Sequence, residues 1–386
     1  MSINFLDLSK GCPLDKQEKF TWKEMAGNPI SKLDDDAFTR VRIILMNGVE
    51  LEALRMKHYL ARFNKDLQLP LAQIRRIEQH QATTINWLLS ADHSPLETTI
   101  AYEQVAIEVT AAVAQTEPDP YQAQTYRFGL LEDFDHLYRY SSMLDRLEGK
   151  DANNILQGYT DIIPGRLTTY HHRAPIDDLR NCYQKENAHL ITKIHAALIT
   201  GAEYQTHDYY MNIGPTFADP VARALYAEIA SVEEQHVTQY ESLMDPTETL
   251  FEKWLIHEAT EVYAYISCVE QETNPRIKAI WERFLDYEIG HLNLACRLFE
   301  KYERRDPAEL LDASLPNMID FKSQRDFVLK VLKEEVNLRT NGPIYVDLKN
   351  ESKETLKYRK QLNSQGVPAE IISAGYNWKP GTELNQ

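Results

Sequence analysis

The sequence predicts an all-α protein made of two tandem four-helix bundles, an irregular linker and a partly helical C-terminal tail. Of the 386 residues, 14 are glycine. Long stretches rich in Ala, Leu, Glu, Gln and Arg repeat apolar residues at intervals of three and four, without sustained alternation. A chain of this length can bury two separate cores. The segments 37–148 and 179–305 each fit one bundle.

Proline marks the predicted helix starts. A proline in the first turn of a helix costs no hydrogen bond, because the N–H that it lacks would have no intrahelical partner there. The first bundle is expected to contain helices over 38–63, 71–90, 96–117 and 120–147, with Pro70, Pro95 and Pro120 near their starts. The second bundle is expected to contain helices over 179–211, 219–244, 247–273 and 275–304, with Pro220, Pro246 and Pro275 in the same role.

The segments outside the bundles are rich in turn residues. Residues 1–36 are expected to be irregular, and so is the linker 149–178, which contains several Asn, Gly and Pro residues. The tail 306–386 is expected to contain two amphipathic helices. These are predicted over 321–338 and 352–361. We expect the end of the tail, from Gly375, to cover a neighbouring subunit, as in a homodimer.

The charge balance excludes several classes of partner. With 42 Lys and Arg against 58 Asp and Glu, the net charge is −16, so we expect no nucleic acid and no membrane surface as a partner. No apolar run approaches the length of a membrane span, and the first residues show no targeting pattern, which indicates a cytoplasmic protein. The four cysteines lack the spacing of a metal-binding motif or a disulfide scaffold, so we expect reduced thiols.

One spacing of acidic residues and histidine occurs three times in the chain. An acid follows a glutamate after thirty positions, and a histidine comes three positions later. Residues three apart share one face of a helix. Thirty residues span half a helix, a turn and half of the returning helix, which brings the upstream glutamate level with the pair across a hairpin. The three sets are Glu103/Asp133/His136, Glu203/Glu233/His236 and Glu258/Glu288/His291.

The second predicted bundle has a complete set of metal-ligand residues. Four carboxylates in a low-dielectric interior repel one another unless cations or protons neutralise them. Mixed oxygen and nitrogen donors suit two iron ions, and manganese fits the same donors. The alternative is a set of exposed acids on helix faces with incidental histidines. The predicted ligands are Glu203, Glu233, His236, Glu258, Glu288 and His291.

The first predicted bundle looks like a degenerate copy of the second. A shift of 155 positions places Glu103, Asp133 and His136 on the last of the three sets, which indicates an internal duplication. The position equivalent to Glu233 is Ile77, so this copy either keeps a residual metal site or serves packing alone. Such a second site would comprise Glu50, His80, Glu103, Asp133 and His136, with Glu132 or Glu108 as a substitute for the missing carboxylate.

Several nearby residues have weaker patterns. Glu261 and Glu234 are next to predicted ligands, and we interpret both as surface acids. His257 and His207 either donate a hydrogen bond to a ligand carboxylate or are exposed. The pair His171-His172 in the linker is interpreted as part of a loop.

The ligand pattern resembles that of the ferritin-like di-iron carboxylate proteins, in which two helices each supply a Glu and two others each supply Glu-x-x-His. The residues that carry the resemblance are Glu203, Glu233-Glu-Gln-His236, Glu258 and Glu288-Ile-Gly-His291. It implies that Glu233 and Glu288 bridge two ions, with Glu203 and His236 on one ion and Glu258 and His291 on the other. Family members usually join the second and third helices by a long crossover, whereas here only 244–247 separates them.

Three functions fit these features. The first is an oxidase or oxygenase that activates O2 or peroxide at two iron ions and acts on a small organic substrate, with an electron-donor protein as a partner. The second is a ferroxidase or peroxide scavenger without an organic substrate. The third is a structural helical protein that a metal staples together. We expect the first, because the chain is much longer than a single bundle requires.

Overall fold

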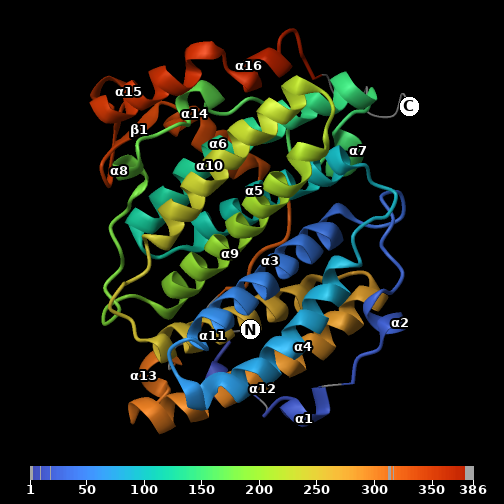
Figure 1. Ribbon diagram of the computed structural model, residues 1–386, viewed down its shortest axis with the longest axis vertical. Helices are drawn as coiled ribbons and strands as arrows, with labels where there is room; N and C mark the ends of the chain where they lie inside the picture. The colour runs from blue at the N-terminus through green and yellow to red at the C-terminus, as the bar shows by residue number, and fades with distance from the viewer. Residues whose placement is uncertain (1–2, 9, 18, 312–313, 316, 379–386) are drawn as a thin grey trace. The chain divides into compact units, whose positions relative to one another are not determined.

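Helices dominate the computed structural model, which describes residues 3–8, 10–17, 19–311, 314–315 and 317–378 (Figure 1). The predicted all-α class is confirmed. Beside the helices, the described residues form one antiparallel pair of short strands, β1 (Leu338–Asn341) and β2 (Ile344–Asp347). The end of the predicted tail, 379–386, and Pro316 lie outside the described residues. No helix in the described part of the chain combines the length and the apolar character needed to cross a bilayer.

The chain divides into two compact units that alternate along the sequence. Unit 1 comprises Met1–Ala91, Tyr183–Gly201 and Met244–Asp320, and unit 2 comprises Asp92–Cys182, Ala202–Leu243 and Phe321–Gln386. The helices of unit 1 are α1 (Leu14–Gln17), α2 (Trp22–Met25), α3 (Ala37–Leu60), α4 (Gln68–Asn86), α11 (Leu250–Gln271), α12 (Pro275–Glu303) and α13 (Ala308–Leu311).

Unit 2 contains the remaining helices and both strands. Helix α9 (Leu190–Ile213) contributes its first half to unit 1 and its second half to unit 2. The other helices of unit 2 are α5 (Pro95–Thr116), α6 (Pro120–Glu148), α7 (Asn153–Leu156), α8 (Pro175–Asp178), α10 (Pro220–Glu241), α14 (Arg325–Glu335), α15 (Lys353–Leu362) and α16 (Pro368–Ile372).

The units differ from the predicted bundles in how the helices are grouped. The sequence predicted four consecutive helices in each bundle, whereas unit 1 packs α3 and α4 with α11 and α12, as the blue and orange helices of Figure 1 show. Unit 2 combines α5 and α6 with α10 and the second half of α9. A helical hairpin buries one apolar face against a partner hairpin. Its own sequence does not say which hairpin that partner is.

The long helices begin where the sequence provides caps. Ser94 and Glu97 form a reciprocal capping box at the start of α5, and Thr249 and Glu252 do the same at α11. Asp or Asn side chains cap α6, α10 and α12 immediately before their first proline. These caps explain why the predicted starts of these five helices are close to the observed ones, whereas α9, predicted from 179, begins at Leu190.

The short helix α1 lies against α12 in unit 1, although residues 1–36 were predicted to be irregular. A Cβ at Gly290 would lie 2.1 Å from the carbonyl oxygen of Cys12. Only glycine allows this close approach. The contact brings the Gln17 side chain to His291, where its Oε1 lies 2.7 Å from Nε2.

Candidate metal centre

The six ligands predicted for one centre lie in two units. Glu203, Glu233 and His236 belong to unit 2, and Glu258, Glu288 and His291 belong to unit 1. Each set forms a buried cluster with residues from the helices predicted to form the degenerate copy. The structure therefore contains two clusters, one in each unit, instead of one complete and one degenerate site.

The cluster in unit 2 contains four carboxylates and two imidazoles. Helices α5 and α6 supply three of them, and α9 and α10 supply the other three. Every one of these side chains is buried, and their ligand atoms fall into two groups in which all atoms lie within 4.8 Å of one another. Glu233 belongs to both groups. The first group is Asp133, Glu203, Glu233 and His236, and the second is Glu103, His136 and Glu233.

The ring nitrogens of the two histidines face Glu233 from opposite groups. Nδ1 of His136 lies 3.0 Å from Oε1 of Glu233, and Nδ1 of His236 lies 3.2 Å from its Oε2. Both Nδ1 atoms, both oxygens of Asp133 and one oxygen each of Glu203 and Glu233 are buried without a partner in hydrogen-bond geometry. Buried polar atoms of folded proteins normally have a partner. The unpartnered oxygen and nitrogen atoms of this cluster are suited to bind metal ions.

Glu132 fixes the orientation of His236. Its Oε2 lies 2.8 Å from Nε2 of His236, while its Oε1 accepts hydrogen bonds from Arg166 and Arg173. An Nε2–H that donates to a carboxylate leaves the Nδ1 lone pair free for an ion. Glu132 therefore points inwards, as predicted. It contacts His236 instead of taking the place of the missing carboxylate ligand. Glu108 instead accepts bonds from Thr160 and the backbone of Gln324.

The linker, which has only short helical turns, packs against this cluster. It contributes Arg166 and Arg173, whose charges compensate Glu132. The His171 ring lies 5.3 Å from the His136 ring, and its Nε2 lies close to the carbonyl oxygen of Arg166. The linker thus forms one wall of the cluster.

Burial makes the metal-free cluster retain protons. Burial raises the pKa of Glu203 to about 7, and burial together with the charge of Glu233 raises the pKa of Glu103. Burial also raises the pKa of Asp133, with further contributions from the neighbouring carboxylates. For Glu233, burial opposes ionisation, but the two histidines outweigh it and lower the pKa. Metal ions would replace the retained protons.

The metal-free protein is expected to lose stability as the pH rises from 5.5 to 8. Glu203 and, in unit 1, Glu78 have their pKa raised by burial to about 7. The stability that such a raised pKa contributes is complete below the ordinary value of 4.5 and is lost as the pH rises through about 7. Because Glu132 and Glu233 have lowered pKa values, their contributions change below this range. Burial lowers the pKa of His171 and His257, which acts in the opposite direction, but more buried acids have a raised pKa than buried histidines have a lowered one. Melting curves in chelator at both pH values check the prediction. An equal or higher melting temperature at pH 8 would contradict it.

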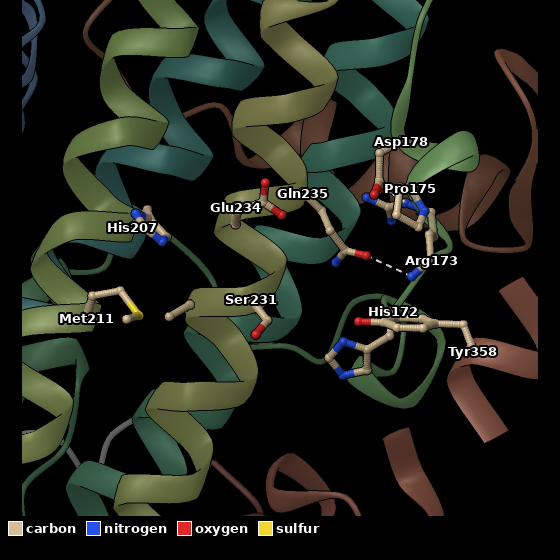
Figure 2. Close-up of a pocket in the computed structure, with 11 residues that line it drawn as sticks. His172, Arg173, Pro175, Asp178, His207, Met211, Ser231, Glu234, Gln235 and Tyr358 are labelled. Carbon is tan, nitrogen blue, oxygen red and sulfur yellow. Dashed lines mark hydrogen bonds and ion pairs between the residues drawn. The ribbon is translucent and has the colours of Figure 1, made fainter. Parts of the chain in front are cut away.

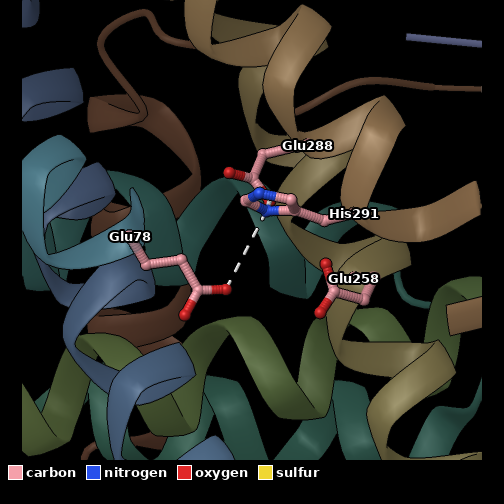
Figure 3. A group of neighbouring side chains, drawn as sticks. All are labelled: Glu78, Glu258, Glu288 and His291. Carbon is pink, nitrogen blue, oxygen red and sulfur yellow. Dashed lines mark hydrogen bonds and ion pairs between the residues drawn. The ribbon is translucent and has the colours of Figure 1, made fainter. Parts of the chain in front are cut away.

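The cluster in unit 1 also contains two groups of possible ligands, and Glu288 belongs to both groups. Figure 3 shows the first group, in which His291 and Glu288 from α12 face Glu258 from α11 and Glu78 from α4. Nδ1 of His291 lies 2.9 Å from Oε2 of Glu288. The second group is Glu50, Glu261 and Glu288.

Three predictions for this region were wrong. The position taken for the equivalent of Glu233 was Ile77, but Ile77 lies in the core and Glu78 carries the carboxylate. His80, a predicted ligand, is half-buried with its ring 5.0 Å from Phe20. Glu261, interpreted as a surface acid, is fully buried.

Several residues of the two clusters were missed by the sequence analysis. Glu78 and Gln81 follow Glu50, which was a predicted ligand, with a spacing of 28 and then three, so allowing a variable spacing in the pattern would have found both. Lys57 gives no such signal, because a lysine on a helix is ordinarily exposed. Tyr210 and Tyr265 donate hydrogen bonds to the upstream glutamates, Glu103 and Glu50 respectively.

A cavity of about 260 Å³ lies within unit 2 (Figure 2). Residues of α9, α10 and the linker line it, together with Tyr358 of α15. One lining residue, Arg173, also donates to Glu132, and its backbone N–H donates to Gln235 next to His236. The cavity is therefore linked to the cluster through Glu132. His207, predicted to be either a hydrogen-bond donor to a ligand or exposed, lines this cavity.

Comparison of the chain with protein-family models, with characterised proteins and with solved structures finds no match.

Proposed function

We propose that unit 2 binds two divalent metal ions and uses them in an oxidation that consumes O2 or peroxide. The observation that carries the proposal is the cluster of four carboxylates and two histidines, fully buried, with unpartnered oxygen and Nδ1 atoms facing one another. Arg166 and Arg173 pair with Glu132, which is not one of the four carboxylates of the cluster. Without cations, the cluster can reduce its repulsion only by binding protons.

The donor set favours iron or manganese. Asp133, Glu203 and His236 would hold one ion, Glu103 and His136 would hold the other, and Glu233 would lie between them. When bound, such a pair of ions supplies the electrons that reduce O2 or peroxide. The chain's own residues provide the dry site, the ligand geometry and, through Glu132, the orientation of His236.

The order of helices in unit 2 supports the resemblance to ferritin-like proteins. Residues 149–189 separate α6 from α9, which is the long crossover that the family uses between its second and third helices. The short connection 244–247, which was at odds with the family pattern, instead links α10 of unit 2 to α11 of unit 1. The repeated hairpins also fit the proposed internal duplication.

A small organic substrate would bind in the cavity next to Glu132. Ligand sites commonly occupy cavities of a few hundred cubic ångströms that combine apolar surface with a few polar groups. Met211, Ala230 and Pro175 supply the apolar surface, and His172 and Arg173 supply polar groups. This arrangement favours an enzyme over a metal-storage protein.

Loading the metal-free protein with ferrous iron under argon and then adding O2 tests the proposal. We expect the iron of unit 2 to oxidise within seconds and O2 to be consumed, because both ions are redox-active and share one carboxylate. An O2 electrode and stopped-flow absorbance follow the reaction. Iron that binds but stays ferrous for minutes would instead indicate a structural metal. Repeated turnover without an organic additive would indicate a ferroxidase or a scavenger.

A further inference from the structure

Besides Glu78 in the place of Asp133, three side chains distinguish the cluster in unit 1 from the cluster in unit 2. Gln81 stands where the pattern of unit 2 has His136. Lys57 comes seven positions after Glu50 in unit 1, and Thr110 comes seven positions after Glu103 in unit 2, so the two residues are equivalent. Glu261 comes three positions after Glu258 in unit 1. The equivalent residue in unit 2, three positions after Glu203, is Thr206. Unit 1 has thus gained one buried cation and one buried carboxylate.

The Lys57 ammonium occupies the space of the first ligand group. The side chain is fully buried, and its Nζ contacts Glu78, lies 2.8 Å from Oε1 of Glu258 and 3.5 Å from Oε2 of Glu261. Glu78 and Glu258 are two of the four members of that group. An ion placed among them would lie against the ammonium group, and the two positive charges would repel each other.

The second ligand group keeps unpartnered oxygens. Oε2 of Glu50, Oε1 of Glu261 and Oε1 of Gln81 are buried without a partner in hydrogen-bond geometry, while Oε2 of Glu261 lies 3.5 Å from the Lys57 ammonium and 3.7 Å from Nε2 of His257. Glu50 uses its other oxygen to accept from Gln81 and Tyr265, and Gln81 also donates to Glu288 at 2.7 Å. The group therefore offers carboxylate and amide oxygens and no nitrogen ligand.

The carboxylates of the cluster outnumber its permanent positive charge. Glu50, Glu78, Glu258, Glu261 and Glu288 bring five carboxylates, against which Lys57 sets one permanent charge. The imidazoles of His291 and His257 lie beside Glu288 and Glu261 respectively. One divalent ion would remove much of the remaining negative charge, and all-oxygen donors select a hard ion such as Mn²⁺, Mg²⁺ or Ca²⁺.

We propose that unit 1 binds a single hard divalent cation between Glu50, Glu261 and Glu288, and that the Lys57 ammonium takes the place of a second ion. The full chain then binds three divalent ions, two in unit 2 and one in unit 1. The ion of unit 1 has no neighbouring metal and no histidine ligand. Its role is to hold α3, α11 and α12 together.

Titration of the metal-free full chain with MnCl2, followed by electron paramagnetic resonance and isothermal calorimetry, tests this proposal. We expect three Mn²⁺ per chain in the wild type, two in Glu261→Thr and one in the double variant Glu233→Ala/His236→Ala. The double variant disables unit 2 alone. If only the unit 1 site fails, the wild type binds two ions and the double variant none, whereas if only unit 2 fails to bind metal, both proteins bind one.

The variant Lys57→Thr, which copies Thr110, is expected to gain one Mn²⁺ relative to its parent. In the double-variant background the count should rise from one to two. No Mn²⁺ in the double variant would overturn the proposal, because protons would then neutralise the cluster. Two Mn²⁺ in the double variant with Lys57 intact would overturn it as well. Should Lys57→Thr fail to fold, the loss of one ion in Glu261→Thr still decides the matter.

Discussion

Replacing Glu233 with alanine is expected to remove both ions from unit 2 and to abolish oxidation of ferrous iron there. Glu233 is the carboxylate common to the two ligand groups, and each of its oxygens faces a different histidine. Its loss removes one donor from each ion and one of the negative charges that attract them. Metal analysis after gel filtration should show two fewer ions per chain, and the oxidation rate should fall by roughly a thousandfold or more.

The matched control is Glu241→Ala, which removes an exposed carboxylate from the end of the same helix. It should leave the metal content and the oxidation rate unchanged, since Glu241 bonds to Tyr204 and belongs to neither ligand group. A Glu233→Ala protein that keeps its full metal content would show that the ions, if bound, are held elsewhere.

Replacing Glu132 with alanine is expected to destabilise unit 2 and to weaken metal binding together. Glu132 is buried against Arg166 and Arg173, and its removal leaves two buried guanidinium groups with less compensating charge. Removing one partner of a buried ion pair costs about 3 to 5 kcal/mol. His236 also loses the acceptor that orients it, which typically weakens metal affinity by about 10- to 100-fold. Chemical denaturation and metal titration measure the two effects.

Asp135→Ala provides the comparison, because Asp135 is a buried carboxylate one turn along α6 that pairs with Arg139 and not with a predicted ligand. It should destabilise the protein without changing the metal affinity. If Glu132→Ala and Asp135→Ala change the metal affinity equally, Glu132 acts on general stability and does not orient His236.

The helices could be predicted from the sequence because their signals are local. Apolar spacing, prolines and caps mark most of them within a few residues, as for α5, predicted at 96–117 and found at Pro95–Thr116, but α9, predicted from 179, begins only at Leu190. The ligand spacing likewise identified three of the four hairpins, since both members of a pair lie on one short stretch of helix. These signals do not depend on the rest of the chain.

The pairing of hairpins could not be predicted in the same way. All four hairpins carry an inward-facing glutamate and a partly apolar face, so the sequence allows several combinations. The assumption that neighbours in sequence pack together assigned Glu258 and Glu203 to one centre, whereas the structure places them in different units. Long-range packing decides this choice, and periodicity carries no information about it.

Some individual positions were predicted wrongly or missed for a related reason. The match between the two predicted copies placed His80 on His236 and therefore Ile77 on Glu233, whereas the buried cluster of unit 1 contains Glu78, followed by Gln81. Lys57 could not be recognised, because its burial depends on carboxylates from α4 and α11. Buried ionic groups of this kind become visible only once the helices are assembled.

The most direct test of a two-ion centre in unit 2 is an anomalous difference map from crystals of the full chain grown with Mn²⁺. We expect two strong peaks flanking Glu233, one next to Nδ1 of His136 and the other next to Nδ1 of His236. A map without peaks in unit 2, in which the carboxylates of the cluster pair with one another through shared protons, would contradict the account.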